Sequence, residues 1–319
     1  VTTTMTSNDN NHHQRPSQPS FPHFDLHMVQ VGEDDTTLRR CHVVAKLFGS
    51  VQYWKRSIVV NRTWNDHQQW VQLGQSLIDK NNNDSKYKHV HHLGFPVRTD
   101  LVVALAELLQ QQGSSLADPT VETRPRPVDV AHFWPAPSAT QAQGAESRWV
   151  HADHGQLRDR VSETLVQWAK THHLSYTIHV DLAGEGGEPG RNQVQGPYLQ
   201  KMLETKIIVV AQRDDWEDHF RLLEGVLAGA CVFTDPMLTL PSGFVNGTSI
   251  VEYTSAQNLQ SLLDYYLTHA AERISIAQAG RKLAMERHRT WHRMEQVVLG
   301  QPISICNDTH GQPCTPWVA

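Results

Sequence analysis

The stretch KIIVVAQRDDWEDHFRLLEGVLAGACVFTD, residues 206–235, contains the pattern that decides the fold. Both of its ends are short apolar runs rich in β-branched residues, as is typical of strands that are buried on both faces. Between them, Phe220, Leu223 and Leu227 recur at helical spacing and predict an amphipathic helix. The small residues 228–230 then allow this helix to pass close to the next strand. A strand, a helix and a strand in this order favour a parallel α/β unit.

Polar residues at the start of this helix have a structural and a functional explanation. Asp215 is expected to cap the helix, with Asp218 three residues on in the position of a capping-box acid. Glu217, Arg221 and Glu224 share a second stripe, and a solvated, salt-bridged face is the ordinary explanation for such spacing. However, the helix follows a buried strand, so it begins at the carboxyl edge of the sheet, where open α/β folds bind ligands. The spacing alone leaves both explanations open.

Strands and helices alternate on both sides of this stretch, which predicts an α/β protein of two Rossmann-like domains. The first domain is short of strands and the chain begins at Val1, so we expect this domain to be truncated. A proline-rich segment without periodicity separates the two halves and is the predicted linker. The predicted parts are a disordered tail (1–22), the first domain (23–113), the linker (114–127), the second domain (128–300) and a tail (301–319).

Composition excludes several classes of partner. Among the 319 residues the net charge is -5 and no cluster of lysine and arginine stands out, so nucleic acid is not an expected partner. No apolar run approaches the roughly 18 residues of a membrane span, so none is expected in this chain. Glycosylation sequons at Asn61, Asn83, Asn246 and Asn307 favour the secretory pathway or Golgi lumen slightly over the cytoplasm.

Residues 206–253 resemble the C-terminal, nucleotide-sugar-binding half of GT-B glycosyltransferases. The nearest similarity is to the CgeB-like group and, more remotely, to exostosin-like enzymes, and it extends over roughly residues 126–298. The residues that carry it are Arg221, Glu224, Gly229, Ala230, Asp235, Pro241, Asn246, Gly247, Ala277 and Gly280. The resemblance implies a GT-B fold with two Rossmann-like domains facing a cleft. It also implies metal-independent transfer of a hexose or pentose from a UDP- or GDP-sugar to a hydroxyl acceptor, without a cofactor.

The resemblance also implies roles for individual residues. Glu224 matches a glutamate that holds the ribose hydroxyls of the donor nucleotide. Arg221, one turn earlier, either neutralises diphosphate charge or pairs with Glu217 and Glu224, and both alternatives stay open. Arg213 and His219 are further candidates for contact with the phosphates or the sugar. The donor is expected in the second domain and the acceptor in the cleft against the first.

Two features depart from the family pattern. Many retaining members carry two glutamates eight positions apart, but the residue eight before Glu224 is Trp216. The acids between 214 and 218 also oppose a phosphate at this end of the helix, so some of them must point away or meet a cation from elsewhere. The candidates for that cation are Arg148, Arg158 and Arg191.

The first domain offers candidates for the catalytic base. Asp34 and Asp35 follow its first predicted strand, where an inverting transferase would need a carboxylate to deprotonate the acceptor hydroxyl. If no base is present, two other functions remain. One is a non-catalytic protein that binds a nucleotide sugar or a glycan, and the other is a sugar-nucleotide epimerase of GT-B architecture.

His288 and His292 are spaced i, i+4 on a predicted helix, the spacing of two metal ligands. No third ligand stands near them in a zinc-protease pattern. We therefore expect surface or packing histidines here and no metal site.

Overall fold

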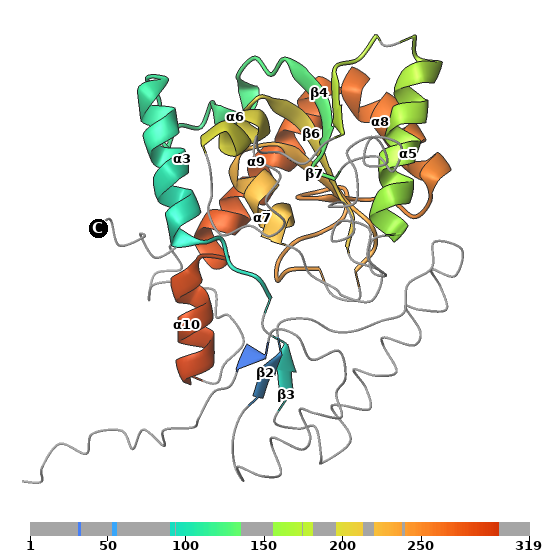
Figure 1. Ribbon diagram of the computed structural model, residues 1–319. Helices are drawn as coiled ribbons and strands as arrows, with labels where there is room; N and C mark the ends of the chain where they lie inside the picture. Colours follow the sequence, from blue (N-terminus) through green and yellow to red (C-terminus); the bar gives the residue numbers. More distant parts are fainter. Residues whose placement is uncertain are drawn as a thin grey trace, which may run out of the picture.

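A computed structural model describes residues 31–32, 53–55, 90–92, 94–134, 156–173, 175–180, 196–212, 220–237 and 240–299 (Figure 1). The strands are β1 (Val31–Gly32), β2 (Tyr53–Lys55), β3 (Val90–His92), β4 (Val128–His132), β5 (Ile178–Val180), β6 (Thr205–Val210), β7 (Cys231–Thr234) and β8 (Val251–Glu252). The helices are α3 (Thr99–Gln111), α5 (Gln156–Thr171), α6 (Gly196–Leu203), α7 (Phe220–Leu227), α8 (Ala256–Thr268), α9 (Ala270–Arg287) and α10 (Thr290–Leu299), with a 3-10 turn, η1 (Val121–Thr123).

The larger sheet has five strands in the order β5-β4-β6-β7-β8, and each neighbouring pair is parallel. Chain order runs outward from β4 to β5 and then returns to β6 on the other side of β4. The direction of winding therefore reverses between β4 and β6, which makes their carboxyl ends the topological switch point. Strands β1, β2 and β3 form a second parallel sheet, which Figure 1 shows apart from the first.

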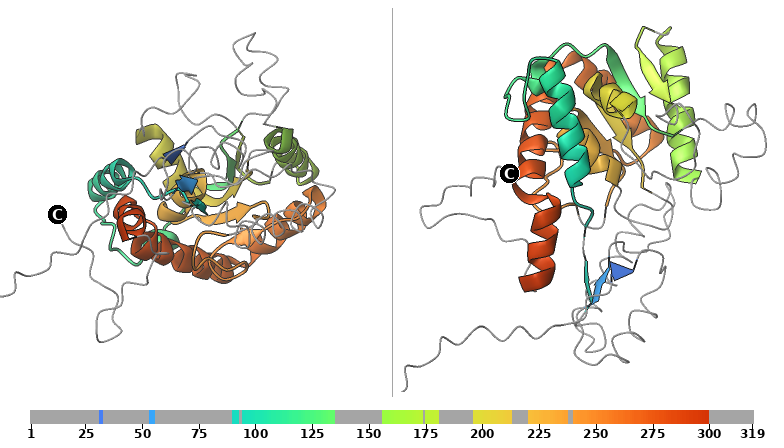
Figure 2. Two further views of the ribbon diagram at one scale, coloured as in Figure 1. Left: turned by 90° about the horizontal axis from the view of Figure 1, so that it is seen from below. Right: turned by 60° about the vertical axis from the view of Figure 1, so that its left-hand side comes forward.

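The core lies in two layers, one on each face of the five-stranded sheet. Alternate residues of β6 enter different layers: Ile208 and Val210 belong to one cluster, Ile207 and Val209 to the other. Helices α3, α6 and α7 cover the first face, and α5 and α8 cover the second, while α9 contributes to both (Figures 1 and 2). The predicted α/β fold with parallel strands is thus confirmed, and the arrangement of two domains around a cleft stays a prediction.

Helix α7 lies close to the sheet because it contains a glycine on the packed side. A Cβ atom on Gly225 would meet Val232 at 3.1 Å and Ile208 at 3.2 Å, tighter than ordinary packing. Gly229 then ends the turn after the helix with φ +76°, a conformation that side chains rarely adopt. The helix does pass close to the next strand, but Gly225 within α7 permits this, whereas a Cβ atom on Gly229 would meet Arg126, Val121 and Glu122.

The predicted linker is folded against the second domain. Val121 and Arg126 are buried, and the guanidinium of Arg126 donates to the carbonyls of Thr205 and Ala228 at 2.8 Å each. Helix α3, which the sequence places in the first domain, packs in the same cluster as α6 and α7. Its start meets the junction of α9 and α10, where Val97 N donates to His288 O at 2.5 Å (Figure 2). The ordered contacts of the second domain therefore begin before residue 113.

The long C-terminal helix expected from the sequence is two helices. Helix α9 ends at Arg287 and α10 begins at Thr290, with His288 in a non-helical conformation between them. The break is explained by Val97, which pairs with Arg289 as an isolated bridge. Helical spacing of apolar residues also predicts helices at 36–49 and 63–79, which lie outside the described residues.

Both histidines at this break pack inside the protein. His288 contacts the Ser242 carbonyl through Nε2 at 2.8 Å, and His292 Nδ1 accepts from Arg289 N at 3.0 Å. Burial is the main cause that lowers the pKa of His288 to about 3 and that of His292 to about 4. These contacts fit the packing role expected for the pair.

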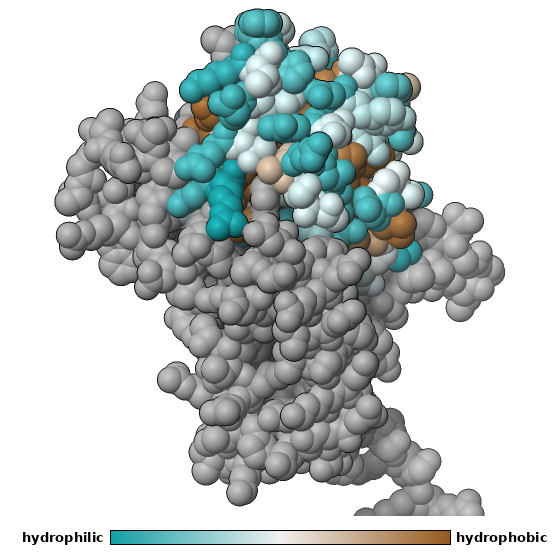
Figure 3. All heavy atoms as spheres, turned by 90° about the vertical axis from the view of Figure 1, so that its right-hand side faces the viewer, coloured by the Kyte–Doolittle hydropathy of each residue, from teal (hydrophilic) through white to brown (hydrophobic). Residues whose placement is uncertain are grey.

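On the side of α5, the outer surface of the described residues is mostly hydrophilic (Figure 3). The apolar residues of α5 point inward instead, including Leu157, Leu165 and Trp168. Such a face is ordinary for a solvated helix layer.

A substitution at Gly280 tests how closely α9 packs against the backbone at Ser249. A Cβ atom there would lie 2.5 Å from the Ser249 carbonyl oxygen, so we expect Gly280→Ala to lower the free energy of unfolding by about 1–3 kcal/mol. Gly196→Ala is the control because nothing lies within 4 Å of its added Cβ, and it should change stability little. Urea unfolding measures both. Equal stability of the two variants would contradict the described packing.

Candidate functional site

Polar side chains gather at the carboxyl ends of β4 and β6, the topological switch point of the sheet. His132 is the last residue of β4, and its Nδ1 donates to the Val209 carbonyl of β6 at 2.8 Å. Burial is the largest of the causes that bring the pKa of His132 down to about 4, and the positive charges of Arg158 and Arg221 also lower it. His132 is therefore neutral at pH 7, and both guanidinium groups lie close to it.

Arg158 enters this site from the first turn of α5. Only 2% of the residue is exposed, and its Nε donates to the carbonyl of Ala211, just after β6, at 3.0 Å. The guanidinium also lies over the ring of Trp134, 5.0 Å from the centroid. These contacts fix a buried positive charge at the ends of β4 and β6.

Arg221 and Glu224 lie on α7, the helix that follows β6. Arg221 is partly buried, and its guanidinium lies 5.5 Å from the centre of the Phe220 ring. Glu224 is only 3% exposed, and its Oε2 accepts a hydrogen bond from the Tyr198 hydroxyl of α6 at 2.7 Å. The solvated salt-bridged face, which is the ordinary explanation for this stripe, does not describe Glu224.

Tyr198 connects the helices to β4. Its ring packs edge-on against Phe133, the residue after His132, with the ring centres 5.2 Å apart. The hydroxyl of the same residue holds Glu224. One buried aromatic side chain thus links the end of β4 with the carboxylate of α7.

Asp235 follows β7 and ties two loops together. Its Oδ1 accepts from the backbone N–H of Gln212 at 2.7 Å, which joins the segment after β6 to the segment after β7. The Gln212 side chain is buried, and its Oε1 makes no hydrogen bond with any residue in the described part of the chain. Such an orphaned acceptor is unusual in a protein interior and is common at functional sites.

The chemistry of this edge suits a ligand that carries both negative charge and hydroxyl groups. Arg158 and Arg221 supply positive charge in a partly desolvated place, where ion pairing is stronger than in water. Glu224 supplies an acceptor: a carboxylate has about four lone-pair positions, so the bond from Tyr198 leaves capacity for hydroxyl donors. A phosphate-bearing polyol combines both requirements.

The structure brings together some of the residues expected from the sequence. Arg221 and Glu224 lie at the switch point, and Arg158, one of three cations proposed to offset the acids, is there as well. Arg213, His219, Asp34 and Asp35 lie outside the described residues, as do Arg148 and Arg191.

Sequence reasoning missed His132, Tyr198 and Gln212. His132 ends β4 and Gln212 lies two residues after β6, the kind of position that the argument for Asp34 and Asp35 used in the first domain but not in the second. Tyr198 had no such signal, because an aromatic residue in the first turn of a helix is usually a packing residue. Its role depends on the contact with Glu224, which is 26 positions away.

The described residues contain neither a candidate metal site nor a candidate membrane span. Within the described ranges, no three His, Cys, Asp or Glu side chains are grouped so that they could hold a metal ion. Over the same ranges, no helix combines the length and apolar character needed to cross a bilayer.

Comparison with known families identifies one similarity. Residues 158–298 match the model of a family described as glycosyl transferase-like. The matched part begins at Arg158 and includes Tyr198, Arg221 and Glu224, whereas His132 lies before it. No curated protein matches the chain at a significant level.

Solved structures give weak similarities. HepE of Anabaena, in complex with UDP and glucose, is 14% identical, with 86% of this chain and 71% of that chain covered and a TM-score of 0.46. Sucrose-phosphate synthase of Thermosynechococcus elongatus is 12% identical, with coverages of 81% and 68% and a TM-score of 0.45. The C-terminal domain of the Francisella tularensis glycosyl transferase LpcC is 18% identical, with coverages of 58% and 93% and a TM-score of 0.33. TM-scores below 0.5 are too low to assign an activity.

The neutral state of His132 predicts a pH dependence of stability. The folded-state pKa of about 4 is below the ordinary value of 6.5, so acid favours the unfolded chain, which takes up the proton. The contribution of His132 is complete above pH 6.5 and is lost as the pH falls towards 4. Between pH 7 and pH 5 this loss is about 2 kcal/mol.

His132→Asn isolates the contribution of His132 to the pH dependence of stability. The asparagine amide can still donate to the Val209 carbonyl, but it does not titrate. We expect urea unfolding to show a smaller loss of stability between pH 7 and pH 5 in the variant than in the wild type. The other buried histidines titrate in both proteins, so their contributions cancel when the two losses of stability are compared. An identical loss in the two proteins would show that His132 is not buried in its neutral form.

Proposed function

We propose that this protein is a glycosyltransferase that moves a sugar from a nucleotide-diphosphate sugar to a hydroxyl acceptor. The observation that carries the proposal is the grouping of Arg158, Arg221 and Glu224 around the carboxyl ends of β4 and β6. The glycosyl transferase-like match over residues 158–298 supports it. The donor would bind at this edge, with its diphosphate towards the arginines and its ribose towards Glu224.

The arginines would stabilise the departing diphosphate. When the bond between the sugar and the diphosphate breaks, negative charge grows on the leaving oxygen. Arg158 is held against the Ala211 carbonyl and the Trp134 ring, so its charge is in place before the reaction begins. His132 is neutral at pH 7 and adds no charge there, which leaves the stabilisation to the guanidinium groups.

Glu224 would position the nucleotide rather than react. Tyr198 donates to one carboxylate oxygen and fixes the orientation of the side chain. Two neighbouring ribose hydroxyls are suited to donate to the remaining lone pairs, which would give the site its preference for a nucleotide over free diphosphate.

Finer features of the reaction belong to the same proposal. The donor is a UDP- or GDP-sugar carrying a hexose or pentose, no cofactor or metal ion takes part, and Asp34 or Asp35 is the catalytic base. Arg213 and His219 are further donor contacts, and the acceptor binds in a cleft against the first domain. We also propose kinship with the CgeB-like and exostosin-like group, and a place in glycan biosynthesis in the secretory pathway.

Turnover of defined donors tests the function. Purified protein would be incubated with UDP- and GDP-sugars, with and without hydroxyl acceptors, and the release of nucleoside diphosphate and the sugar products would be measured. Transfer to an acceptor, or hydrolysis of the donor, supports the transferase. Donor binding without either reaction indicates a binding protein, and interconversion of donor sugars without transfer indicates an epimerase.

Glu224→Gln tests the nucleotide site directly. The amide keeps the size of the side chain but loses the charge and half of its acceptor capacity, so UDP or GDP should bind about tenfold more weakly or worse. Isothermal titration calorimetry measures the affinity. Glu224→Ala should abolish binding but also leaves the Tyr198 hydroxyl without its acceptor.

Glu107→Gln on the exposed side of α3 is the matched control, since it removes the same charge away from the site. It should bind nucleotide like the wild type. Unchanged affinity in Glu224→Gln, with thermal unfolding confirming the fold, would eliminate Glu224 from the site.

A further inference from the structure

A second polar site lies at the opposite, amino edge of the sheet. A cavity of about 180 Å³ opens between the starts of β6 and β7, the segment around η1, and α9. This is far more space than the roughly 30 Å³ that a water molecule occupies in the liquid. The residues that line it are Glu122, Thr123, Arg124, Pro125, Arg126, Lys206, Gly229, Cys231, Arg273, Ile274 and Ala277.

Arg126 is the most buried cation of this cavity, with 7% of the residue exposed. Its two terminal nitrogens donate to four backbone carbonyls, of Val121, Met202, Thr205 and Ala228. Its Nε is buried and has no hydrogen-bond acceptor among the described residues. Within the described chain, the charge of Arg126 is therefore met by carbonyl dipoles and not by a hydrogen-bonded carboxylate.

Arg273 repeats this arrangement on the other side of the cavity. It comes from the first turn of α9, is 8% exposed, and donates through Nη1 to the carbonyls of Tyr266 and Leu267 at the end of α8. These carbonyls carry the negative end of the helix dipole, which compensates a cation only in part. Two guanidinium groups thus line one cavity, each anchored by carbonyl oxygens.

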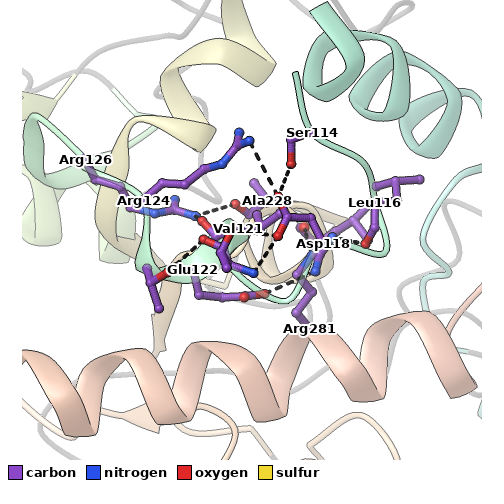
Figure 4. A network of polar contacts seen from close by, with 12 residues as sticks. Ser114, Leu116, Asp118, Val121, Glu122, Arg124, Arg126, Ala228 and Arg281 are labelled. Atoms are coloured by element: carbon purple, nitrogen blue, oxygen red, sulfur yellow. Dashed lines mark hydrogen bonds and ion pairs between the residues drawn. The ribbon is translucent and has the colours of Figure 1, made fainter. Parts of the chain in front are cut away.

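The other charges nearby do not restore neutrality. Lys206 pairs with Asp129 at 2.5 Å, Arg124 lies 3.8 Å from Asp118, and Arg281 lies 3.3 Å from Glu122 (Figure 4). Each of these carboxylates is matched by its own cation. Five cations and four carboxylates leave a net positive charge: Arg124, Arg126, Lys206, Arg273 and Arg281 against Asp118, Glu122, Asp129 and Glu272.

Crowding of these cations has a measurable cost. Burial is the largest of the causes that bring the pKa of Arg126 down to about 10; the positive charges of Arg281, Arg124 and Arg273 also lower it, whereas Glu122 raises it. The close-up in Figure 4 shows Arg124 and Arg126, from the segment after η1, and Arg281, from α9, reaching one network. A bound anion would relieve this repulsion.

We propose that the cavity at the amino edge binds a small oxyanion, such as a phosphate group, between Arg124, Arg126, Lys206 and Arg273. The net positive charge suits an anion, and Arg124, Lys206 and Arg273 carry N–H donors for its oxygens. Arg126, whose terminal N–H groups bond to carbonyls, contributes its charge. The thiol of Cys231 at the cavity wall does not take part as an anion, because burial raises its pKa to about 12.

This site is separate from the proposed donor site. Lys206 and Cys231 stand at the beginnings of β6 and β7, whereas Arg158 and Arg221 approach their other end. The strands themselves lie between the two groups of arginines. An anion at the amino edge would hold η1, α9 and the starts of two central strands together, and would stabilise the domain without touching the donor.

Calorimetric titration with inorganic phosphate tests the proposal, at an ionic strength held constant with chloride. Arg124→Gln removes a cation whose side chain is 25% exposed, so the variant should fold. We expect phosphate to bind the wild type and to bind Arg124→Gln about tenfold more weakly or worse. Thermal unfolding should show the same order, with phosphate raising the midpoint of the wild type more than that of the variant.

Two further variants identify where the phosphate binds. Lys282→Gln removes an exposed cation from the same helix as Arg273 and should leave phosphate affinity unchanged. Arg221→Gln alters the carboxyl edge, where the proposed donor site can also take phosphate, and should remove only that binding while the site lost in Arg124→Gln remains. Absence of phosphate binding, equal affinity in the wild type and Arg124→Gln, or loss only in Arg221→Gln would each overturn the proposal. None of these results depends on whether the protein transfers a sugar.

Discussion

The position of β6 in the middle of the sheet is the constraint on which the rest of the structure depends. The strand pairs with β4 on one side and β7 on the other, and its side chains enter the hydrophobic layers on both faces. Because the chain leaves β4 in one direction and returns to β6 in the other, the loops after these two strands diverge. His132, Ala211 and Gln212 border the space that this divergence creates. The close approach of α7, which Gly225 permits, then brings Arg221 and Glu224 to the same place.

Buried arginine side chains at both edges of the sheet are hydrogen-bonded to backbone carbonyls. At the amino edge, hydrogen bonds to backbone carbonyls near the ends of α6, α7 and α8 partly offset the charges of Arg126, Arg273 and Arg281. At the carboxyl edge, Arg158 uses the carbonyl of Ala211 and the face of Trp134. Buried guanidinium groups need such partners, because a lone charge in the interior is costly. Where carbonyls only partly compensate the charge, an anionic ligand is the natural complement, and this condition holds at both edges.

Much of the second domain could be predicted from its sequence, and the reason is the strength of its hydrophobic pattern. β6 and β7 are apolar runs with sharp polar boundaries, and the helical spacing of Phe220, Leu223 and Leu227 predicted the helix between them, where α7 lies. The break at His288 could not be predicted, since it depends on pairing with Val97, nearly two hundred positions earlier. The burial of α3 and η1 against the second domain was missed for the same reason. Local composition marked a linker, while the contacts of Arg126 with Thr205 and Ala228 are long-range.

The candidate site was predicted only where residues share one helix. The stripe of Arg221 and Glu224 was visible at helical spacing, but the contact between Tyr198 and Glu224 joins two helices and needs the fold. The family resemblance supplied the role for Glu224, and no periodicity in the sequence could have done so. Arg158 was one of three arginines that satisfied the need for a cation, and only the structure places it beside His132.

Hydrogen exchange with and without nucleotide tests most directly the claim that the donor binds at the carboxyl edge. The backbone amides would be followed by mass spectrometry in the presence of UDP or GDP. If this claim is right, nucleotide should slow the exchange of amides in the segments that end β4, begin α5 and form α7, and should change little around η1 and the start of α9. Protection confined to the amino edge, or no change with either nucleotide, would contradict it.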